Sequence, residues 1–318
     1  MVQLSQLVPS NYLVEKEKFF HDHDYNPQFE YAQPIDPSFL VHYGTPDSAL
    51  LQKSRQLIEF NIEYRKEQIA RRSDAMQYSQ AEVQRLTQNY LATLDITDRY
   101  EIVWSKEAIT RCTIAKNHIT FRIGADFSPE TLQGILDHEL GTHALRRIND
   151  EKQPWHDHRK KFELSNHLIT EEGLATLHKY LSKPRSLLYG AALKYVAVGI
   201  AQKHSFAQTW KQLQIFYESE EKLWNTVFRA KRGLSDASKP GGYTKDIVYF
   251  QGAYEVVGWL AQHDFDPTKL YVGRISVIDV ERAWELRTAD PQLPTFLLDN
   301  PAAYRDKIKS IIRENQFA

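Results

Sequence analysis

Residues 130–148 read ETLQGILDHELGTHALRRI, and this stretch decides what the rest of the chain is built around. Ser128 stands just before it as an N-cap, and Pro129 fits the first turn of a helix. Glu130 follows, an acid suited to the positive end of the helix dipole. We therefore expect one helix that begins at Ser128–Pro129 and carries the polar sequence His-Glu-Leu-Gly-Thr-His in its middle.

His138 and His143 lie five residues apart on that helix. Two histidines that grip one zinc ion from a regular helix lie four residues apart. Five residues turn through about 140°, so a shared metal requires one π-type turn, and Gly141 lowers the steric cost of such a turn. The pattern predicts a widened turn between His138 and His143; the alternative is a pair of ordinary polar histidines.

Period-2 runs occur just before this helix, and helical periodicity dominates elsewhere. The strand candidates are Tyr100–Trp104, Thr110–Ala115 and His118–Ile123, with Lys116-Asn117 as a hairpin turn. Helices are predicted over Tyr12–His21, from Asp47 to about Arg72, and over Gln80–Leu94, Leu168–Leu181, Ser186–Lys203, Phe206–Tyr217, Glu221–Lys231, Ile247–His263, Val277–Arg287 and Pro301–Glu314. The predicted fold class is α+β, predominantly helical, with a small, mostly antiparallel sheet before the HExxxH helix and a helical C-terminal half.

The predicted organisation is an N-terminal strap followed by one domain. Residues 1–45 carry four prolines and many aromatic side chains, which favours an extended strap with one short helix. Residues 46–318 then form a single domain. It comprises N-terminal helices over 46–95, the sheet and the HExxxH helix over 96–150, and the helical half over 166–318.

Composition excludes several classes of protein. The chain has 318 residues, 40 basic against 41 acidic, for a net charge of −1, so we expect no nucleic acid as partner. No apolar run approaches the roughly 18 residues that span a bilayer, so we expect no membrane partner. Cys112 is the single cysteine, which excludes an internal disulfide. A soluble, cytoplasmic protein is the expectation.

A second acidic motif, Thr170-Glu171-Glu172-Gly173-Leu174-Ala175, follows on a predicted helix. A catalytic zinc site uses three protein ligands and one open position, and in one class of zinc proteases the third ligand is a Glu on a downstream helix. Glu172 suits that role, since small neighbours such as Gly173 would let its helix pack closely on the metal-bearing helix. The alternative is a solvated acidic first turn that answers the helix dipole.

Taken together, a hairpin edge, a helix with two His and a Glu, and a second helix with a Glu follow the order of a zincin-type catalytic core. In that design an edge strand, here Arg111–Ala115, pairs with an extended peptide. Asp137, Asn149 and Glu171 are the candidates to hold a ligand imidazole by its other nitrogen.

A long glycine-containing loop, from Arg229 to Tyr249, collects several cations and a tyrosine. Such a loop is suited to clamping a carboxylate and stabilising an oxyanion. An ordinary surface loop with solvated charges is the alternative.

Several of these segments, in this order, resemble the microtubule-associated tyrosine carboxypeptidase family and its bacterial QEGLA-motif relatives. The resemblance runs through HELGTHALRRIND, QPW, TEEGLA, RAKRG and PGGYTKDIVYFQG, and more faintly through NPQFEY. It implies a zincin-like metallopeptidase that removes a C-terminal aromatic residue from a peptide or protein tail. By the family pattern His138, His143 and Glu172 would hold one zinc ion and Glu139 would be the general base. The glutamine of QEGLA is Glu171 here, as in some members.

Eukaryotic members carry a long basic N-terminal extension that is thought to sit on the microtubule. This chain is neutral and starts almost at the catalytic region, which makes microtubule binding doubtful.

The expected activity assigns further roles. Tyr249 or a neighbouring donor would stabilise the oxyanion, and a fixed cation must bind the substrate's α-carboxylate. Lys245 and Arg232 are the first choices for that cation, followed by Arg111. Two alternatives stay open: a zinc endopeptidase or aminopeptidase with the same triad, and a non-enzymatic helical binding protein with a vestigial metal site.

Overall fold

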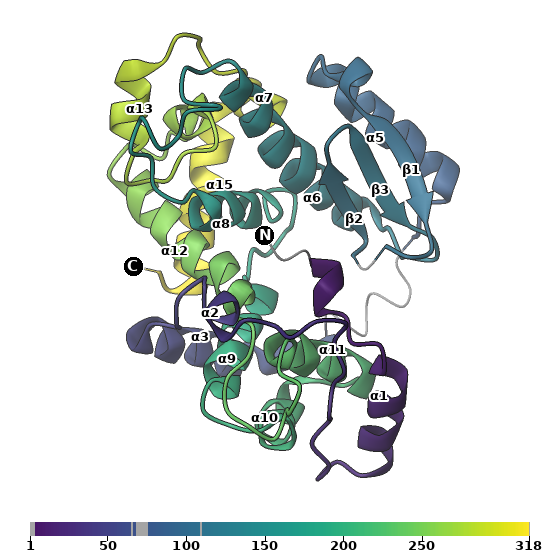
Figure 1. Cartoon of the computed structure of the whole chain (residues 1–318). Helices are drawn as coiled ribbons and strands as arrows, with labels where there is room; N and C mark the ends of the chain where they lie inside the picture. The colour runs from purple at the N-terminus through teal and green to yellow at the C-terminus, as the bar shows by residue number, and fades with distance from the viewer. Residues whose placement is uncertain (1–3, 65, 68–75, 109, 318) are drawn as a thin grey trace. The chain divides into compact units, whose positions relative to one another are not determined.

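A computed structural model describes residues 4–64, 66–67, 76–108 and 110–317 (Figure 1). These residues form two compact units, each built from two stretches of the chain. The first unit comprises residues 1–70 and 189–251, and the second comprises residues 71–188 and 252–318. The expected strap over 1–45 therefore belongs to the first unit, and the single domain over 46–318 stays a prediction.

The second unit contains the sheet and most of the motifs. Its elements are α5 (Gln80–Thr93), η2 (Thr97–Arg99), β1 (Glu101–Ser105), β2 (Cys112–Ala115), β3 (His118–Arg122), α6 (Pro129–His138), η3 (Glu139–Ala144), α7 (Leu145–Glu151), α8 (Leu168–His178), η6 (Thr268–Val272), α13 (Val280–Leu286), α14 (Thr295–Leu298) and α15 (Pro301–Asn315).

The sheet has three strands among the described residues, in the order β1-β3-β2 (Figure 1). β2 and β3 form the predicted antiparallel hairpin around Lys116-Asn117, with Ala115 opposite His118. β1, however, pairs with β3 in parallel. The expectation of a mostly antiparallel sheet is therefore wrong, because the hairpin signal concerns only β2 and β3, and the pairing of β1 is set by a longer connection. The predominantly helical α+β class is confirmed.

Local signals place the helices of this unit. Ser79 caps α5 through a complete capping box with Glu82. Ser128 caps α6 by accepting a hydrogen bond from Thr131 N, and Pro129 is its first residue. The helix α6 therefore begins where the sequence predicts.

The first unit is helical. Its elements are η1 (Leu4–Leu7), α1 (Tyr12–His21), α2 (Pro37–Leu40), α3 (Ser48–Phe60), α9 (Tyr189–Ala201), α10 (Phe206–Leu213), η4 (Gln214–Phe216), α11 (Glu220–Lys231) and η5 (Thr244–Asp246). The helix α12 (Ile247–Ala261) begins in this unit, and its residues from Gly252 belong to the second.

The strap residues pack on the body of the first unit. Phe19 of α1 is fully buried, and its ring lies 4.9 Å from the rings of Phe206 and Trp210. Edge-to-face contacts of this kind add to the burial of the rings themselves. Asp47 caps α3, as expected, but α3 ends at Phe60, and the expected end near Arg72 lies outside the described residues.

None of the helices in the described ranges combines the length and the apolar character that a membrane-spanning helix needs.

Candidate metal centre

The helix that begins as α6 widens between the two histidines. Residues Glu139–Ala144 form a π turn, and the N–H of Leu145 bonds to the carbonyl of Leu140, five residues back. One extra residue in a turn brings His143 back toward the face of His138. The predicted widened turn is confirmed.

Gly141 also leaves room for neighbouring side chains. A Cβ at this position would lie 2.6 Å from the hydroxyl of Tyr90 and 2.8 Å from a ring carbon of Phe296. Those distances are below any real contact of a Cβ, so a side chain at this position would force Tyr90 and Phe296 to shift.

The widened turn brings three side chains of the second unit together. The Nε2 atoms of His138 and His143 are 3.2 Å apart. Glu172 Oε2, from α8, lies 3.9 Å from the first and 3.7 Å from the second. Among the described residues these three form a group of ligating atoms within 4.8 Å of one another. Between 14% and 17% of each side chain is exposed, so the centre is reachable.

The donor set fits a zinc ion. Four ligands at about 2.0–2.2 Å around a tetrahedral ion lie about 3.3–3.6 Å from one another. The three separations here bracket that range. Two imidazoles and one carboxylate are the protein ligands of many catalytic zinc sites, in which a fourth position stays open.

Electrostatics also favour a cation at this centre. Burial and the neighbouring His143 lower the pKa of His138 to about 3, so this imidazole is neutral and can ligate. Burial alone would lower the pKa of His143, but hydrogen bonds to Glu171 and Glu172 outweigh it and raise the pKa to about 10. The carboxylates therefore favour a positive charge between the two imidazoles and Glu172. A divalent ion at this position would supply that charge in place of a proton on His143.

Glu171 orients His143 through its second ring nitrogen. His143 Nδ1 is 2.8 Å from Glu171 Oε1, and Arg146 donates to Glu171 Oε2 at 2.5 Å. Burial would raise the pKa of Glu171, but Arg146 and His143 hold it well below its usual range. This carboxylate is therefore ionised and fixes the imidazole so that Nε2 points to the centre.

Asp137 and Asn149, the other two candidates for that role, lie elsewhere. Asn149 donates to the carbonyls of Tyr271 and Gln292 and accepts from Gln292 N, so its amide ties α7 to other segments of the unit. Asp137 accepts from Tyr90 and Gln133. Helical spacing indicates Gln133, four residues before Asp137, but it cannot reveal Tyr90, Tyr271 or Gln292, which are distant in sequence.

Glu139 stands beside the centre, with Oε1 4.0 Å from His138 Nε2. Burial raises the pKa of Glu139 to about 7, helped by Glu172, while His143 and a backbone hydrogen bond from Ile114 oppose the shift. That hydrogen bond puts the carboxylate next to β2, which is an edge strand of the sheet. The expected juxtaposition of an edge strand and the HExxxH helix is therefore present.

The small residues of α8 serve a different contact from the expected one. A Cβ at Gly173 would lie 2.1 Å from the backbone of Gly252, so α8 crosses α12 there rather than the metal-bearing helix. The close approach of α6 to α8 occurs at Gly134, where a Cβ would lie 2.5 Å from the carbonyl of Lys179. The expected role of Gly173 is thus wrong, since the glycine that permits this approach is on α6.

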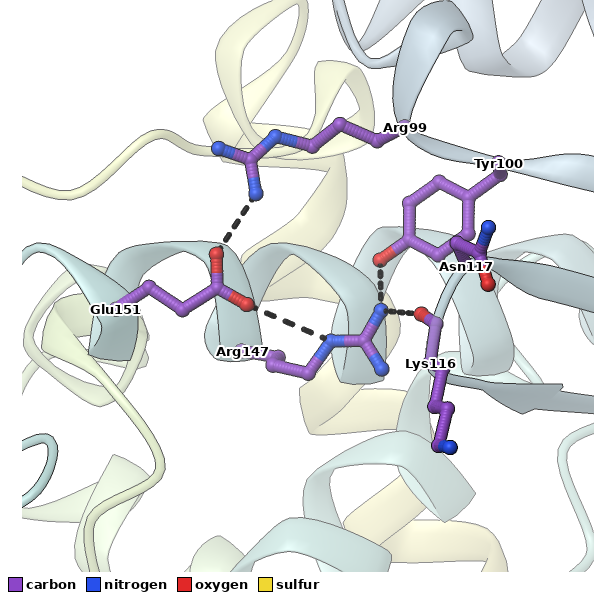
Figure 2. A pocket seen from close by; sticks show the side chains of 6 residues that line it. All are labelled: Arg99, Tyr100, Lys116, Asn117, Arg147 and Glu151. Carbon is purple, nitrogen blue, oxygen red and sulfur yellow. Dashed lines mark hydrogen bonds and ion pairs between the residues drawn. The ribbon is translucent and has the colours of Figure 1, made fainter.

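One turn after His143, Arg147 ties the helix to the sheet. Figure 2 shows its side chain reaching from α7 to the hairpin turn, where it donates to the carbonyl of Lys116 and, at 2.6 Å, to the hydroxyl of Tyr100. Glu151 accepts from Arg99 in the same place, at 2.7 Å. These groups and Asn117 line an open cavity of about 460 Å³. The sheet therefore has a fixed position against the helix.

The loop residues expected to bind substrate belong to the first unit. Arg232 is 8% exposed, and its guanidinium lies 4.9 Å above the ring of Tyr243 without a hydrogen bond or ion pair to any described residue. The side chain of Lys245, half-buried in η5, likewise has none within the part of the chain that the structure describes. Lys194 Nζ lies 4.7 Å above the ring of Tyr249. Arg111, by contrast, is an exposed residue of the second unit next to β2.

Sequence reasoning missed Arg146, which is fully buried and also donates to the carbonyls of Leu270 and Ile275. Its position three residues after His143 was a signal, since helical neighbours at this spacing share a face. The partners more than a hundred residues away left no such signal.

The geometry described so far defines a class, namely proteins with an HExxxH helix and a downstream glutamate that converge on one metal-sized centre. The family model described as "Microtubule-associated tyrosine carboxypeptidase" matches residues 36–305. The chain belongs to the microtubule-associated tyrosine carboxypeptidase family, as its motifs suggested.

Individual relatives agree with the family match. The chain is 32% identical to the putative tyrosine carboxypeptidase MATCAP2 of Mus musculus, over 98% of this chain and 62% of that protein. It is 30% identical to the microtubule-associated tyrosine carboxypeptidase 1 of Rattus norvegicus and 29% identical to that of Homo sapiens, in each case over 98% of this chain and 68% of the relative. The chain thus spans about three fifths to two thirds of these relatives.

Proposed function

We propose that this protein is a zinc metallocarboxypeptidase with a zincin-like core, which hydrolyses a C-terminal aromatic residue such as Tyr or Phe from a peptide or protein tail. The observation that carries the proposal is the convergence of His138, His143 and Glu172, from two helices, on one centre with Glu139 beside it. The relatives' names, which call them tyrosine carboxypeptidases, support the reaction and the residue removed.

In this proposal His138, His143 and Glu172 hold the zinc ion. When bound, zinc polarises the scissile carbonyl and lowers the pKa of a water molecule toward about 7. Glu139 accepts the proton of the attacking water and later delivers it to the leaving amine.

The edge of β2 that faces away from β3 supports an extended binding mode for the substrate, although the N–H of Ile114 on this edge already bonds to Glu139. The N–H of Arg122 bonds to the carbonyl of Arg111, and Thr113 pairs with Thr120. Because backbone groups alternate along a strand, those of Cys112 and Ile114 face away from β3. A peptide that pairs antiparallel with this edge ends at the Cys112 side, next to Arg111, and its upstream residues lie toward the hairpin turn.

The substrate's free carboxylate needs a fixed cation. Arg232 and Lys245 are proposed for this role because neither has an acceptor among the described residues, and Arg111 because of its place at the end of β2. Tyr249 is proposed to donate a hydrogen bond to the developing oxyanion. The ammonium group of Lys194 above the ring of Tyr249 supports this role, because a nearby cation makes the phenol hydroxyl a stronger hydrogen-bond donor.

We further propose a cytoplasmic location and a peptide or protein tail as the partner. Cys112, the single cysteine, is a buried thiol without a disulfide partner among the described residues, which is compatible with a reducing compartment. Binding to microtubules comes from the names of the relatives alone, and a co-sedimentation assay with polymerised tubulin tests it.

The direct test is mass spectrometry of peptides that end in Tyr, Phe or Leu after incubation with the zinc-loaded protein. We expect loss of one C-terminal residue, fastest for the aromatic ends. The same peptides with a C-terminal amide should stay intact, because the cation then has no carboxylate to bind. Cleavage of the amides would indicate an endopeptidase or aminopeptidase, and no cleavage of any peptide would indicate a binding protein.

The variant Glu139→Gln tests the role of the general base separately from zinc binding. Removal of a general base costs about 10²–10⁴-fold in turnover, so we expect a loss of that size. The zinc content should equal that of the wild type, because the three ligands remain. Wild-type turnover by Glu139→Gln would contradict the role of Glu139.

A further inference from the structure

The π turn leaves one carbonyl without its helical partner. In a regular α-helix the N–H of Leu145 would bond to the carbonyl of Gly141, four residues back. Here that N–H bonds to the carbonyls of Leu140 and Thr142. The hydroxyl of Tyr271 donates to the carbonyl of Gly141 instead, at 2.7 Å. Because Tyr271 is fully buried, its hydroxyl supplies the hydrogen bond to this carbonyl that water would supply at the surface.

Thr142 supports the same turn from within. Its hydroxyl donates to the carbonyl of Asp137 at 2.8 Å and lies 2.8 Å from His178 Nδ1. The other ring nitrogen of His178 lies 3.0 Å from the hydroxyl of Tyr304. Thr142 and His178 are fully buried. When neutral His178 carries its hydrogen on Nδ1, it donates to Thr142 Oγ1 and accepts from the hydroxyl of Tyr304 at Nε2, so each of these hydrogens has one acceptor.

His178 also contacts Tyr271, whose hydroxyl oxygen lies 3.4 Å from His178 Nδ1. The two rings are nearly parallel, with an interplanar angle of 11° and centroids 6.2 Å apart. The polar groups of this network bond to one another and to the backbone of the widened turn. The two backbone contacts are the hydrogen bonds from Thr142 to the carbonyl of Asp137 and from Tyr271 to the carbonyl of Gly141. A fully satisfied buried network specifies one conformation, because every alternative leaves a buried polar group unpaired.

We propose that Tyr271, together with Thr142 and His178, is a positioning element that holds the widened turn and thereby keeps His143 on the same face as His138 and Glu172. Without these hydrogen bonds the turn can relax to a regular α-helix, in which the two histidines diverge by about 140°. The consequence for metal binding rests on the proposed function, whereas the consequence for the backbone does not.

The test replaces Tyr271 by Phe, which removes only the hydroxyl. A matched control is Tyr195→Phe, since Tyr195 is also fully buried and its hydroxyl also bonds to the backbone, at Asp47 N, 2.7 Å away in the first unit. Zinc affinity is measured by competition with a chelator. We expect about 10–100-fold weaker zinc binding in Tyr271→Phe and no change in Tyr195→Phe.

A second readout needs no metal. In a crystal structure of zinc-free Tyr271→Phe we expect Leu145 N–H to bond to the carbonyl of Gly141, and the two Nε2 atoms to move apart from 3.2 Å. If wild-type protein binds no zinc, the proposed function fails, and this structure still decides the inference. An unchanged π turn would overturn it, as would wild-type zinc affinity combined with the same loss of thermal stability as in Tyr195→Phe.

If Tyr271→Phe does not fold, Thr142 provides the second variant. Thr142→Val removes the donor to Asp137 with almost no change of shape, whereas Thr142→Ser keeps the hydroxyl. We expect weaker zinc binding in the first and wild-type binding in the second. Equal zinc affinities of Val and Ser variants would overturn the role of Thr142.

Discussion

In each unit an arginine pairs with a buried carboxylate, Arg229 with Asp246 and Arg146 with Glu171, and the two pairs differ in where the carboxylate's second oxygen goes. In the first unit Arg229 binds both oxygens of Asp246, at 2.8 and 2.6 Å. In the second unit Arg146 takes one oxygen of Glu171, and the other meets His143. In the bidentate pair both carboxylate oxygens of Asp246 bond to the same arginine. Glu171 instead bonds to an arginine through one oxygen and fixes the imidazole of His143 through the other. The comparison indicates that Arg146–Glu171 orients His143 of the candidate metal centre, whereas Arg229–Asp246 joins α11 to η5 and places Arg229 against Tyr249.

The largest expected effect comes from removing either arginine. Arg146→Met leaves Glu171 buried and without its cation, and breaking a buried pair in this way costs about 3–5 kcal/mol in the free energy of unfolding. Arg229→Met should cost less, because 26% of that side chain is exposed, against none of Arg146. Urea unfolding of the metal-free proteins measures both. A larger loss for Arg229→Met would reverse the comparison.

The next effect separates the two carboxylates. Glu171→Gln keeps the shape but removes the charge that orients His143, and loss of such a partner weakens metal binding about 10–100-fold. Asp246→Asn is the matched control in the other unit and should leave zinc affinity unchanged. Competition with a chelator measures both values. Equal zinc affinities for the two variants would show that Glu171 does not act through His143.

The smallest effect is the acid dependence of the first pair. Burial would raise the pKa of Asp246, but Arg229 holds it well below its ordinary value. The folded form thus binds fewer protons than the unfolded form, whose pKa is about 3.9. The resulting stability is present above about pH 4 and is lost as the pH falls further.

Asp246→Asn lacks this contribution at every pH. We expect its deficit in unfolding free energy relative to wild type to shrink as the pH is lowered from 7 to about 3. A deficit of constant size over that range would assign the stability to something other than the charge of Asp246.

Local chemistry was readable from the sequence. The capping box of Ser79 and Glu82, the start of α6 and the turn at Lys116-Asn117 depend on neighbours within a few residues. The π turn could also be predicted, because the five-residue spacing of His138 and His143 is incompatible with a regular helix if the two meet. These features need no knowledge of distant segments.

Contacts between distant segments could not be predicted in the same way. The parallel pairing of β1, the crossing of Gly173 with Gly252 and the hydroxyl of Tyr271 on the turn each join residues far apart in the chain. Asn149 was assigned to an imidazole from its helical position, but its partners Tyr271 and Gln292 lie more than a hundred residues away. The periodicity of a sequence predicts which face of a helix or strand is buried, but it does not predict which distant segment packs on that face.

The most direct measurement is anomalous diffraction at the zinc edge from crystals of the zinc-loaded protein. We expect one strong peak bounded by the Nε2 atoms of His138 and His143 and the carboxylate of Glu172, about 2.0–2.2 Å from each. Crystals of Glu172→Ala grown in the same way should show a much weaker peak. A wild-type map with no peak between these three side chains would contradict the metal centre and, with it, the proposed hydrolase.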